Sequence, residues 1–425
     1  MRLPDYTVKI IETLENAGFE AFAVGGCVRD MLMNRMPSDW DITTSAEPEA
    51  VMHVFSEFHT VPTGIKHGTV TVFCGGVPLE ITTYRIDGKY TDSRHPSFVR
   101  FTEKLGEDLR RRDFTVNAMA YNPHRGLVDL FGGRADIEKR VIRCVGAPCE
   151  RFREDALRIM RALRFSAVLG FEISDETAAA AVECRSLLAN VSAERIASEL
   201  NKTLTAPDPY SVLMRFGAVF AEVIPEILPV LGNGGGAWEN TVLAVREAAP
   251  ELCVRLAVLF SGISGSSTAD GDTVSPVSDT ARNGSAAAVS ALGRLKYDNE
   301  TKKTVRTLTE LCGTEIPADK VSVKRVLKKT GSEIFRLLLE VKKAEASRAE
   351  VGDAYACTLQ IEKIFSEIMA AGECFSLDTL AVSGADLIKN GIEPGRKIGL
   401  TLERLLDLVI EGKCKNEKEA LLGAV

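Results

Sequence analysis

The stretch Asp39-Trp40-Asp41, followed by the apolar Ile42, places two carboxylates two residues apart. Side chains at positions i and i+2 of a strand point to the same face, so a strand over residues 39–43 would hold both carboxylates side by side. Two like charges that close repel each other, and a bound cation relieves the repulsion. Oxygen ligands suit Mg²⁺, which is held by one or two carboxylates together with substrate phosphates. The stretch therefore predicts a magnesium site at Asp39 and Asp41, although the same spacing is common in solvated turns.

The residues upstream predict a phosphate-binding turn. An apolar run over residues 21–24 is followed by Gly25-Gly26-Cys27-Val28-Arg29-Asp30. Glycine lets the backbone approach an anion, the N–H groups of a helix N-terminus point toward it, and Arg29 adds a forked donor. Phosphate donors and carboxylates would then face one cleft, as phosphoryl or nucleotidyl transfer requires. The alternative is a plain strand-to-helix turn with Arg29 and Asp30 as a surface pair.

Apolar periodicity predicts an α/β head with a mixed sheet. Cys74-Gly75-Gly76 predicts a hairpin turn, and the polar stretch from Arg85 to Phe101 predicts a mobile loop. The predicted helices cover residues 5–17, 26–33 and 48–55, and the predicted strands cover residues 20–24, 39–43, 64–72 and 78–85.

Two later stretches concentrate charge. Residues 110–113 are Arg-Arg-Arg-Asp, and three successive arginines cannot share one helix face, so at least one points away from the other two. From Arg151 onward the pattern is helical, and Asp155, Arg158 and Arg161 lie three residues apart with Arg164 next. Successive members of such a row are neighbours on a helix. From spacing alone, a solvated, salt-bridged helix face is the favoured interpretation.

Composition places the chain among ordinary globular proteins. Its 425 residues suffice for about three domains, and no apolar run is long enough to span a membrane. Ten scattered cysteines without a Cys-x-x-Cys motif favour reduced thiols and a cytoplasmic location. The net charge of −7 means that any nucleic-acid surface must be a local patch, and the lysine- and arginine-rich stretch from Lys296 to Arg348 is the candidate.

The pattern Gly-Gly-x-Val-Arg-Asp with Asp-x-Asp downstream resembles the tRNA nucleotidyltransferase and poly(A) polymerase family of the polymerase β superfamily, and most closely its class II bacterial CCA-adding branch. The resemblance covers most of the chain. Two further family motifs match: Arg-Arg-Asp-Phe-Thr-x-Asn-Ala over residues 111–118, and Glu-Asp-x-x-Arg-x-x-Arg-x-x-Arg-Phe over residues 154–165.

The resemblance implies a role for each matching residue. Asp39 and Asp41 would bind the metal, and Glu80, on a neighbouring strand, is the candidate third carboxylate, with an exposed residue paired to a cation as the alternative. Gly26 and Arg29 would grip phosphates, Arg112 would contact the nucleotide, and Asp113 and Asn117 would orient the sugar and a loop. The nucleotide would be held and its base read by Asp155, Arg158, Arg161 and Arg164.

The expected fold is α+β, with a small nucleotidyltransferase palm head followed by helices only. The expected activity is template-independent addition of C, C and A to the 3′ end of tRNA from CTP and ATP, with Mg²⁺ and without a membrane. The oligomeric state stays open, with a homodimer among the outcomes. The expected segments are a head (1–145), a neck (146–210), a body (211–295) with a flexible Ser/Gly-rich loop (261–285), and a tRNA-binding tail (296–425).

Three alternatives remain at this point. A bacterial poly(A) polymerase shares head and neck, but the stretch from Thr63 to Thr69 resembles the CCA branch. An enzyme that adds only CC or only A is disfavoured for CC by the full-length loop after Arg85. An inactive RNA-binding protein is disfavoured by the presence of both Asp39 and Asp41. All five histidines lie at or before His124, which excludes a histidine-rich phosphohydrolase domain farther along the chain.

Overall fold

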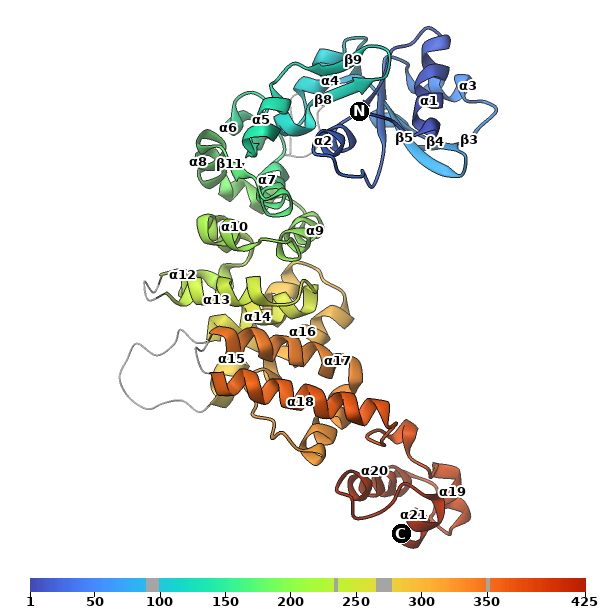
Figure 1. Ribbon diagram of the computed structural model, residues 1–425, viewed down its shortest axis with the longest axis vertical. Coiled ribbons are helices and arrows are strands. Elements are labelled where there is room, and N and C mark those ends of the chain that lie inside the picture. The colour runs from blue at the N-terminus through green and yellow to red at the C-terminus, as the bar shows by residue number, and fades with distance from the viewer. Residues whose placement is uncertain (89–98, 233–235, 265–276, 349–351) are drawn as a thin grey trace. The chain divides into compact units, whose positions relative to one another are not determined.

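The computed structural model describes residues 1–88, 99–232, 236–264, 277–348 and 352–425 (Figure 1). These residues form two compact units, Met1–Pro225 and Glu226–Val425. The first unit contains the mixed sheet and the second is helical. The predicted fold class is therefore confirmed, and the finer division into four segments stays a prediction.

The head is built on a seven-stranded sheet in the order β3-β4-β5-β2-β1-β8-β9. Only the neighbours β2 and β5 are parallel, and the other pairs are antiparallel. The strands are β1 (Ala21–Val24), β2 (Asp41–Thr44), β3 (His59–Gly64), β4 (Thr69–Cys74), β5 (Val77–Thr83), β8 (Met119–Asn122) and β9 (Gly126–Asp129).

Both faces of this sheet are covered, as alternation along β1 shows. Ala21 and Ala23 belong to a core shared with α1 (Asp5–Asn16) and α3 (Pro48–Val54), whereas Phe22 and Val24 belong to a core shared with α4 (Leu105–Arg110). Because side chains alternate along a strand, four successive apolar residues serve both cores. A buried strand in this position explains why residues 21–24 form an unbroken apolar run.

Near the β4–β5 hairpin, the structure agrees with one predicted segment and differs from two. The turn at Gly75 and Gly76 forms as expected, with φ of 61° and 82°, values that suit glycine. The predicted strand over residues 64–72 is wrong at its start, because Ile65–His67 form a 3₁₀ turn. The loop predicted from Arg85 to Phe101 begins and ends as paired strands, β6 (Arg85–Asp87) and β7 (Val99–Phe101), and residues 89–98 lie outside the described residues.

The rest of the first unit is mainly helical. The helix predicted to run on from Arg151 is broken at Asp155, which has extended φ and ψ of −139° and 103°. The Asp155 carboxylate accepts a hydrogen bond from the Leu157 N–H at 3.1 Å, and aspartate commonly caps a new helix in this way. The elements are η2 (Thr115–Asn117), α5 (Gly133–Lys139), β10 (Val141–Ile142), α6 (Pro148–Glu154), α7 (Leu157–Leu169), β11 (Glu172–Ile173), α8 (Asp175–Glu183), η3 (Arg185–Asn190), α9 (Ala193–Leu204), α10 (Tyr210–Arg215) and α11 (Gly217–Val223).

The second unit consists of helices, and none of the described helices is long and apolar enough to cross a membrane. The loop predicted over residues 261–285 is helical at both ends, and residues 265–276 lie outside the described residues. The α-helices of the second unit are α12 (Leu228–Gly232), α13 (Ala237–Glu247), α14 (Leu252–Ser264), α15 (Val277–Arg294), α16 (Asn299–Leu311), α17 (Lys320–Arg348), α18 (Gly352–Ala370), α19 (Gly384–Lys389), α20 (Arg396–Ile410) and α21 (Lys418–Gly423).

Candidate active site

The carboxylates gather where β2 and β5 run side by side. Asp41, the first residue of β2, is paired in register with Glu80 on β5. The strand predicted from Asp39 is wrong at its start, because β2 begins at Asp41 and Asp39 lies in the segment before it. All three residues are exposed by surface area. The parallel pairing thus brings Glu80 to the predicted metal site, although the two residues are far apart in the sequence.

The charges of these carboxylates act on one another. Asp41 is exposed by area, yet the protein around its carboxyl group desolvates it enough to raise its pKa, and repulsion from Asp39 and Glu80 raises the pKa further. Arg112 opposes the rise, and the resulting pKa of Asp41 is about 6. The site therefore carries an excess of negative charge that a cation would relieve.

These residues do not form a complete metal cage by themselves. In the part of the chain that the structure describes, no group of three or more histidine, cysteine, aspartate or glutamate side chains is arranged to hold a metal ion. Mg²⁺, however, usually takes one or two protein carboxylates and completes its shell with water and substrate phosphates. The carboxylate pair fits that mode of binding.

The Gly-Gly turn begins a helix that carries a buried arginine, and it packs against Arg112, whose charge acts on Asp41. Gly25 precedes α2 (Gly26–Leu32) with φ 82° and ψ −129°, and a Cβ atom there would lie 3.0 Å from Arg112 Nη1. Glycine is thus required at position 25, whereas Gly26 is simply the first residue of the helix. Arg29 does pair with Asp30 at 2.8 Å, but it is buried, and its Nη1 donates to Asn117 Oδ1 at 2.7 Å. The alternative of a surface pair does not fit this burial.

A second group of arginines is organised by a buried aspartate that the sequence did not single out. Arg111 and Arg112 both donate to Asp108, at 2.7 Å and 3.4 Å, while Arg110 is exposed. Burial raises the pKa of Asp108, but the charges of Arg111 and Arg112 more than offset burial and lower it overall. Asp108 also lies 3.3 Å from the Thr43 hydroxyl on β2. The helical spacing of three and four residues would have revealed this partner.

Asp113 connects the head to α7. Its Oδ2 accepts from Arg161 Nε at 2.8 Å, and its Oδ1 accepts from the Phe114 N–H and from Asn117 Nδ2, at 2.8 Å and 3.3 Å. Burial raises the pKa of Asp113, but the charges of Arg161 and Arg158 and these hydrogen bonds reverse the shift and bring the pKa to about 2. Asp113 and Asn117 therefore orient Arg161 and Arg29.

The charged row around α7 is not a solvated face. Arg158 is buried and pairs with Glu154 at 2.7 Å, and Arg164 is mostly buried and pairs with Glu199. Asp155 lies before the helix and pairs at 2.9 Å with Arg195 on α9. The structure thus brings the predicted neck residues next to the head, with Asp155 displaced from the helical row. Sequence reasoning missed Arg195 and Glu199, and it gave no separate role to Glu154, whose spacing of four residues from Arg158 is a local signal.

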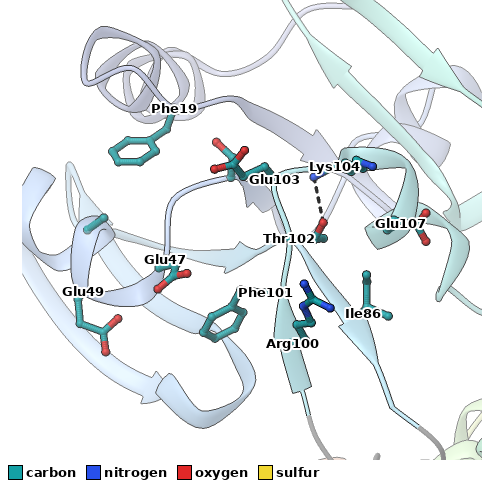
Figure 2. Close-up of a pocket in the computed structure, with 12 residues that line it drawn as sticks. Phe19, Glu47, Glu49, Ile86, Arg100, Phe101, Thr102, Glu103, Lys104 and Glu107 are labelled. Atoms are coloured by element: carbon teal, nitrogen blue, oxygen red, sulfur yellow. Dashed lines mark hydrogen bonds between the residues drawn. The ribbon is translucent and has the colours of Figure 1, made fainter.

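A cavity of about 830 Å³ in the same unit shares none of these residues (Figure 2). It lies beyond the other end of β2, beside the β6–β7 hairpin, and is lined by Phe19, Phe101 and four carboxylates. The lining charges are Glu47, Glu49, Glu103 and Glu107, with Arg100 and Lys104. Such an excess of carboxylates suits a triphosphate poorly, whereas the arginines near Asp41 and on α7 suit its charge.

Three family models match the chain. The poly A polymerase head domain matches residues 21–143, the probable RNA and SrmB-binding site of polymerase A matches residues 170–230, and the putative tRNA nucleotidyltransferase domain 2 matches residues 278–425. Together they span the sheet, the helices that follow it and most of the second unit.

Named proteins resemble the chain over half or nearly all of its length. The CCA-adding enzyme of Lactobacillus delbrueckii subsp. bulgaricus is 35% identical over 414 residues, covering 97% of this chain and 95% of that protein. The CCA-adding enzyme of Geobacillus kaustophilus is 50% identical over 226 residues, covering 53% and 52%. The crystal structure of the Bacillus stearothermophilus CCA-adding enzyme in complex with CTP superimposes with a TM-score of 0.76 at 29% identity, covering 100% and 97%. The resemblance seen in the motifs is therefore confirmed, and the chain belongs to the family of CCA-adding enzymes, the tRNA nucleotidyltransferases.

Proposed function

We propose that this chain has the activity for which its relatives are named. It adds C, C and A to the 3′ end of tRNA from CTP and ATP and releases pyrophosphate. The observation that carries the proposal is the register of Asp41 with Glu80, beside Asp39 and facing Arg112. This arrangement puts negative charge, which suits a metal, next to positive charge, which suits a triphosphate. Nucleotidyl transfer needs both in one place.

Mg²⁺ is the metal that we propose, held by Asp39 and Asp41 with Glu80 as a third carboxylate. The raised pKa of Asp41, with repulsion from Asp39 and Glu80 among its causes, is the feature that fits a dication. When bound, the metal would favour the ionised form of the attacking 3′-hydroxyl and offset charge on the phosphates. Ten free cysteines suit a reducing compartment and support the predicted cytoplasmic location, and the homodimer stays a prediction.

The phosphates would be gripped by Gly26, Arg29 and Arg112, and the rest of the nucleotide by Arg161 and Arg164. Arg29 is already held by Asn117, and Arg161 by Asp113. Prior placement reduces the side-chain entropy that is lost when a ligand binds. Asp113 and Asn117 would in this way serve nucleotide binding through the arginines, in addition to orienting the sugar.

Asp155 and Arg158 would choose the base. Cytosine and adenine both present an amine donor beside a ring-nitrogen acceptor, whereas guanine and uracil present the reverse pattern. A carboxylate accepts from the amine and a guanidinium donates to the ring nitrogen, so no template is needed. Arg195 and Glu154 hold these two groups, at 2.9 Å and 2.7 Å.

Fewer basic residues are available to contact tRNA than the sequence suggested. Several basic residues of α17 pair with carboxylates of the second unit: Lys320 and Lys324 with Glu373, Arg325 with Glu411, and Lys328 with Glu403 and Asp407. Lys303 and Lys329 are exposed. We therefore assign phosphate contacts to these two lysines first.

Incubation with tRNA that lacks its last three nucleotides, all four nucleoside triphosphates and Mg²⁺ tests the function. Sequencing of the 3′ ends should show CCA. A run of A would indicate a poly(A) polymerase, and ends stopping at CC, or needing CC before A is added, would indicate a partial enzyme. No extension at all would favour an RNA-binding protein without activity.

A further inference from the structure

Phe165 on α7 is a side chain around which three arginines gather. Its ring centroid lies 3.9 Å from the guanidinium carbon of Arg164, 5.3 Å from that of Arg161 and 5.4 Å from that of Arg29. All three distances fall within the about 6 Å over which an aromatic ring attracts a cation. Arg161 and Arg164 share the helix of the ring, but Arg29 comes from α2 in the head. One ring thus joins two helices that carry predicted nucleotide ligands.

The ring itself is fixed in place. Phe165 is only 6% exposed, and the ring of Phe114 meets it at 5.8 Å with an interplanar angle of 79°. This edge-to-face contact is a preferred arrangement of aromatic pairs. Because the ring is packed and nearly inaccessible, it acts on a bound nucleotide only through the arginines.

The ring is the partner that the three arginines share. Like charges gathered at one place repel each other, and each arginine is compensated by a different carboxylate. Arg29 pairs with Asp30, Arg161 with Asp113 and Arg164 with Glu199. Asn117 and Asp113 also connect Arg29 with Arg161, but Arg164 pairs elsewhere, whereas the ring contacts all three arginines. An aliphatic side chain would fill the volume of the ring without the negative face that holds cations.

We propose that Phe165 is a positioning residue that sets the spacing of Arg29, Arg161 and Arg164 around the triphosphate. This role rests on the proposed function, in which those arginines bind the nucleotide. Because phosphates are common to CTP and ATP, loss of the ring should weaken the binding of both nucleotides to the same degree. Base choice, assigned to Asp155 and Arg158, should be unaffected.

The test compares Phe165→Leu with Phe171→Leu in the full-length protein. Phe171 is a matched control: it is 4% exposed, and its ring lies 5.8 Å from Arg140, which has no role in the proposed site. Phe165→Leu should raise KM for CTP and for ATP about tenfold, equivalent to about 1.4 kcal/mol, with a much smaller change in kcat. Phe165→Tyr should restore a KM close to that of the wild type. Phe171→Leu should lower the melting temperature but leave KM unchanged.

Fluorinated phenylalanines at position 165 keep the test decisive even if Phe165→Leu does not fold. Fluorine weakens the negative face of the ring while nearly preserving its shape, so the Kd for CTP should rise with each added fluorine. An unchanged Kd across the series, or equal KM increases in Phe165→Leu and Phe171→Leu, would overturn the positioning role. If the wild-type protein itself neither binds CTP nor extends tRNA, the proposed function fails instead.

Discussion

The carboxylate side and the arginine side of the proposed site are built in opposite ways. Asp39, Asp41 and Glu80 are exposed and repel one another, which contributes to the raised pKa of Asp41. On the arginine side, Arg158, Arg161 and Arg164 each pair with a carboxylate at hydrogen-bonding distance. The carboxylates lack the positive charge that a metal ion would bring, whereas the charges of the arginines are already compensated before any ligand binds.

This difference separates residues that serve only the reaction from residues that also serve folding. Removing a carboxylate from a repelling group relieves strain in the unliganded protein, as is common at active sites. Removing one partner of a buried ion pair leaves the other charge uncompensated and destabilises the fold. Substitutions of the carboxylates should therefore lower activity without lowering stability. Substitutions on the arginine side should lower activity and stability together.

The largest effect is expected at the carboxylates. Asp39→Ala or Asp41→Ala should lower the rate of nucleotide addition by on the order of 10³-fold or more, with tRNA affinity retained and the melting temperature equal to or above that of the wild type. Glu47→Ala, which removes an exposed carboxylate from the cavity of Figure 2, is the control and should keep full activity. Near-normal turnover in either aspartate variant would remove that residue from the metal site.

The next effect concerns selectivity. A site built on hydrogen bonds discriminates between bases by about 10⁴-fold, and Asp155→Ala or Arg158→Ala should allow UTP or GTP to gain strongly relative to CTP. Single-nucleotide incorporation on truncated tRNA measures this ratio, with the exposed Arg153→Ala as control. Unchanged discrimination in both variants would mean that the base is read elsewhere.

A third prediction concerns stability on the arginine side. Asp113→Asn should reduce the free energy of unfolding at pH 7 by about 3 kcal/mol, because it removes the charge of a buried carboxylate that compensates the half-buried Arg161. The folded pKa of about 2 lies below the usual unfolded value of about 3.9. The contribution is therefore complete above about pH 4 and is lost as the pH falls toward 2, so the gap between wild type and variant should narrow over that range.

Urea unfolding at a series of pH values measures that gap. Asp175→Asn provides the comparison, since Asp175 pairs with Arg215 at 3.2 Å but is fully exposed, and exposed pairs contribute little. Equal losses of stability in the two variants would contradict the assignment of Asp113 as a buried anchor.

The smallest effect is expected for RNA binding. Lys303→Ala and Lys329→Ala should each weaken tRNA affinity modestly and reduce the dependence of log Kd on log salt by about one. Lys320→Ala is the matched control, because Lys320 already pairs with Glu373 at 2.7 Å. Filter binding at several salt concentrations measures this dependence. An unchanged slope of log Kd against log salt in both test variants would mean that tRNA contacts another surface.

Local sequence signals predicted the parts of this fold that depend on near neighbours. The hairpin at Gly75 and Gly76, the apolar β1 strand and the helices that follow Arg151 all lie close to their predicted ranges. The break at Asp155 was missed because apolar periodicity continues across it, and the extended backbone of one residue leaves no mark on that periodicity. Glycine was expected to matter at position 26, but the unusual backbone angles are those of Gly25.

Long-range partners could not be predicted from the sequence. Arg195 and Glu199 lie far along the chain from Asp155 and Arg164, and nothing in their spacing indicates a contact. Candidate metal and nucleotide residues were found because the motifs name them. The pairing of Arg164 with Glu199 and the contact of Phe165 with Arg29, by contrast, emerge only from tertiary packing.

The parallel pairing of β2 with β5 also bears on how the head folds. The β4–β5 hairpin closes through a two-residue turn, whereas the pairing of Asp41 with Glu80 closes a longer loop that contains α3, β3 and β4. Contacts between residues distant in sequence form late, because closing a long loop costs entropy before any contact compensates for it. We therefore expect the three acidic side chains to come together later than the local β4–β5 hairpin forms. We expect a head in which β2 and β5 are not yet paired to have little affinity for a divalent cation, so binding of that cation would report that these two strands have paired.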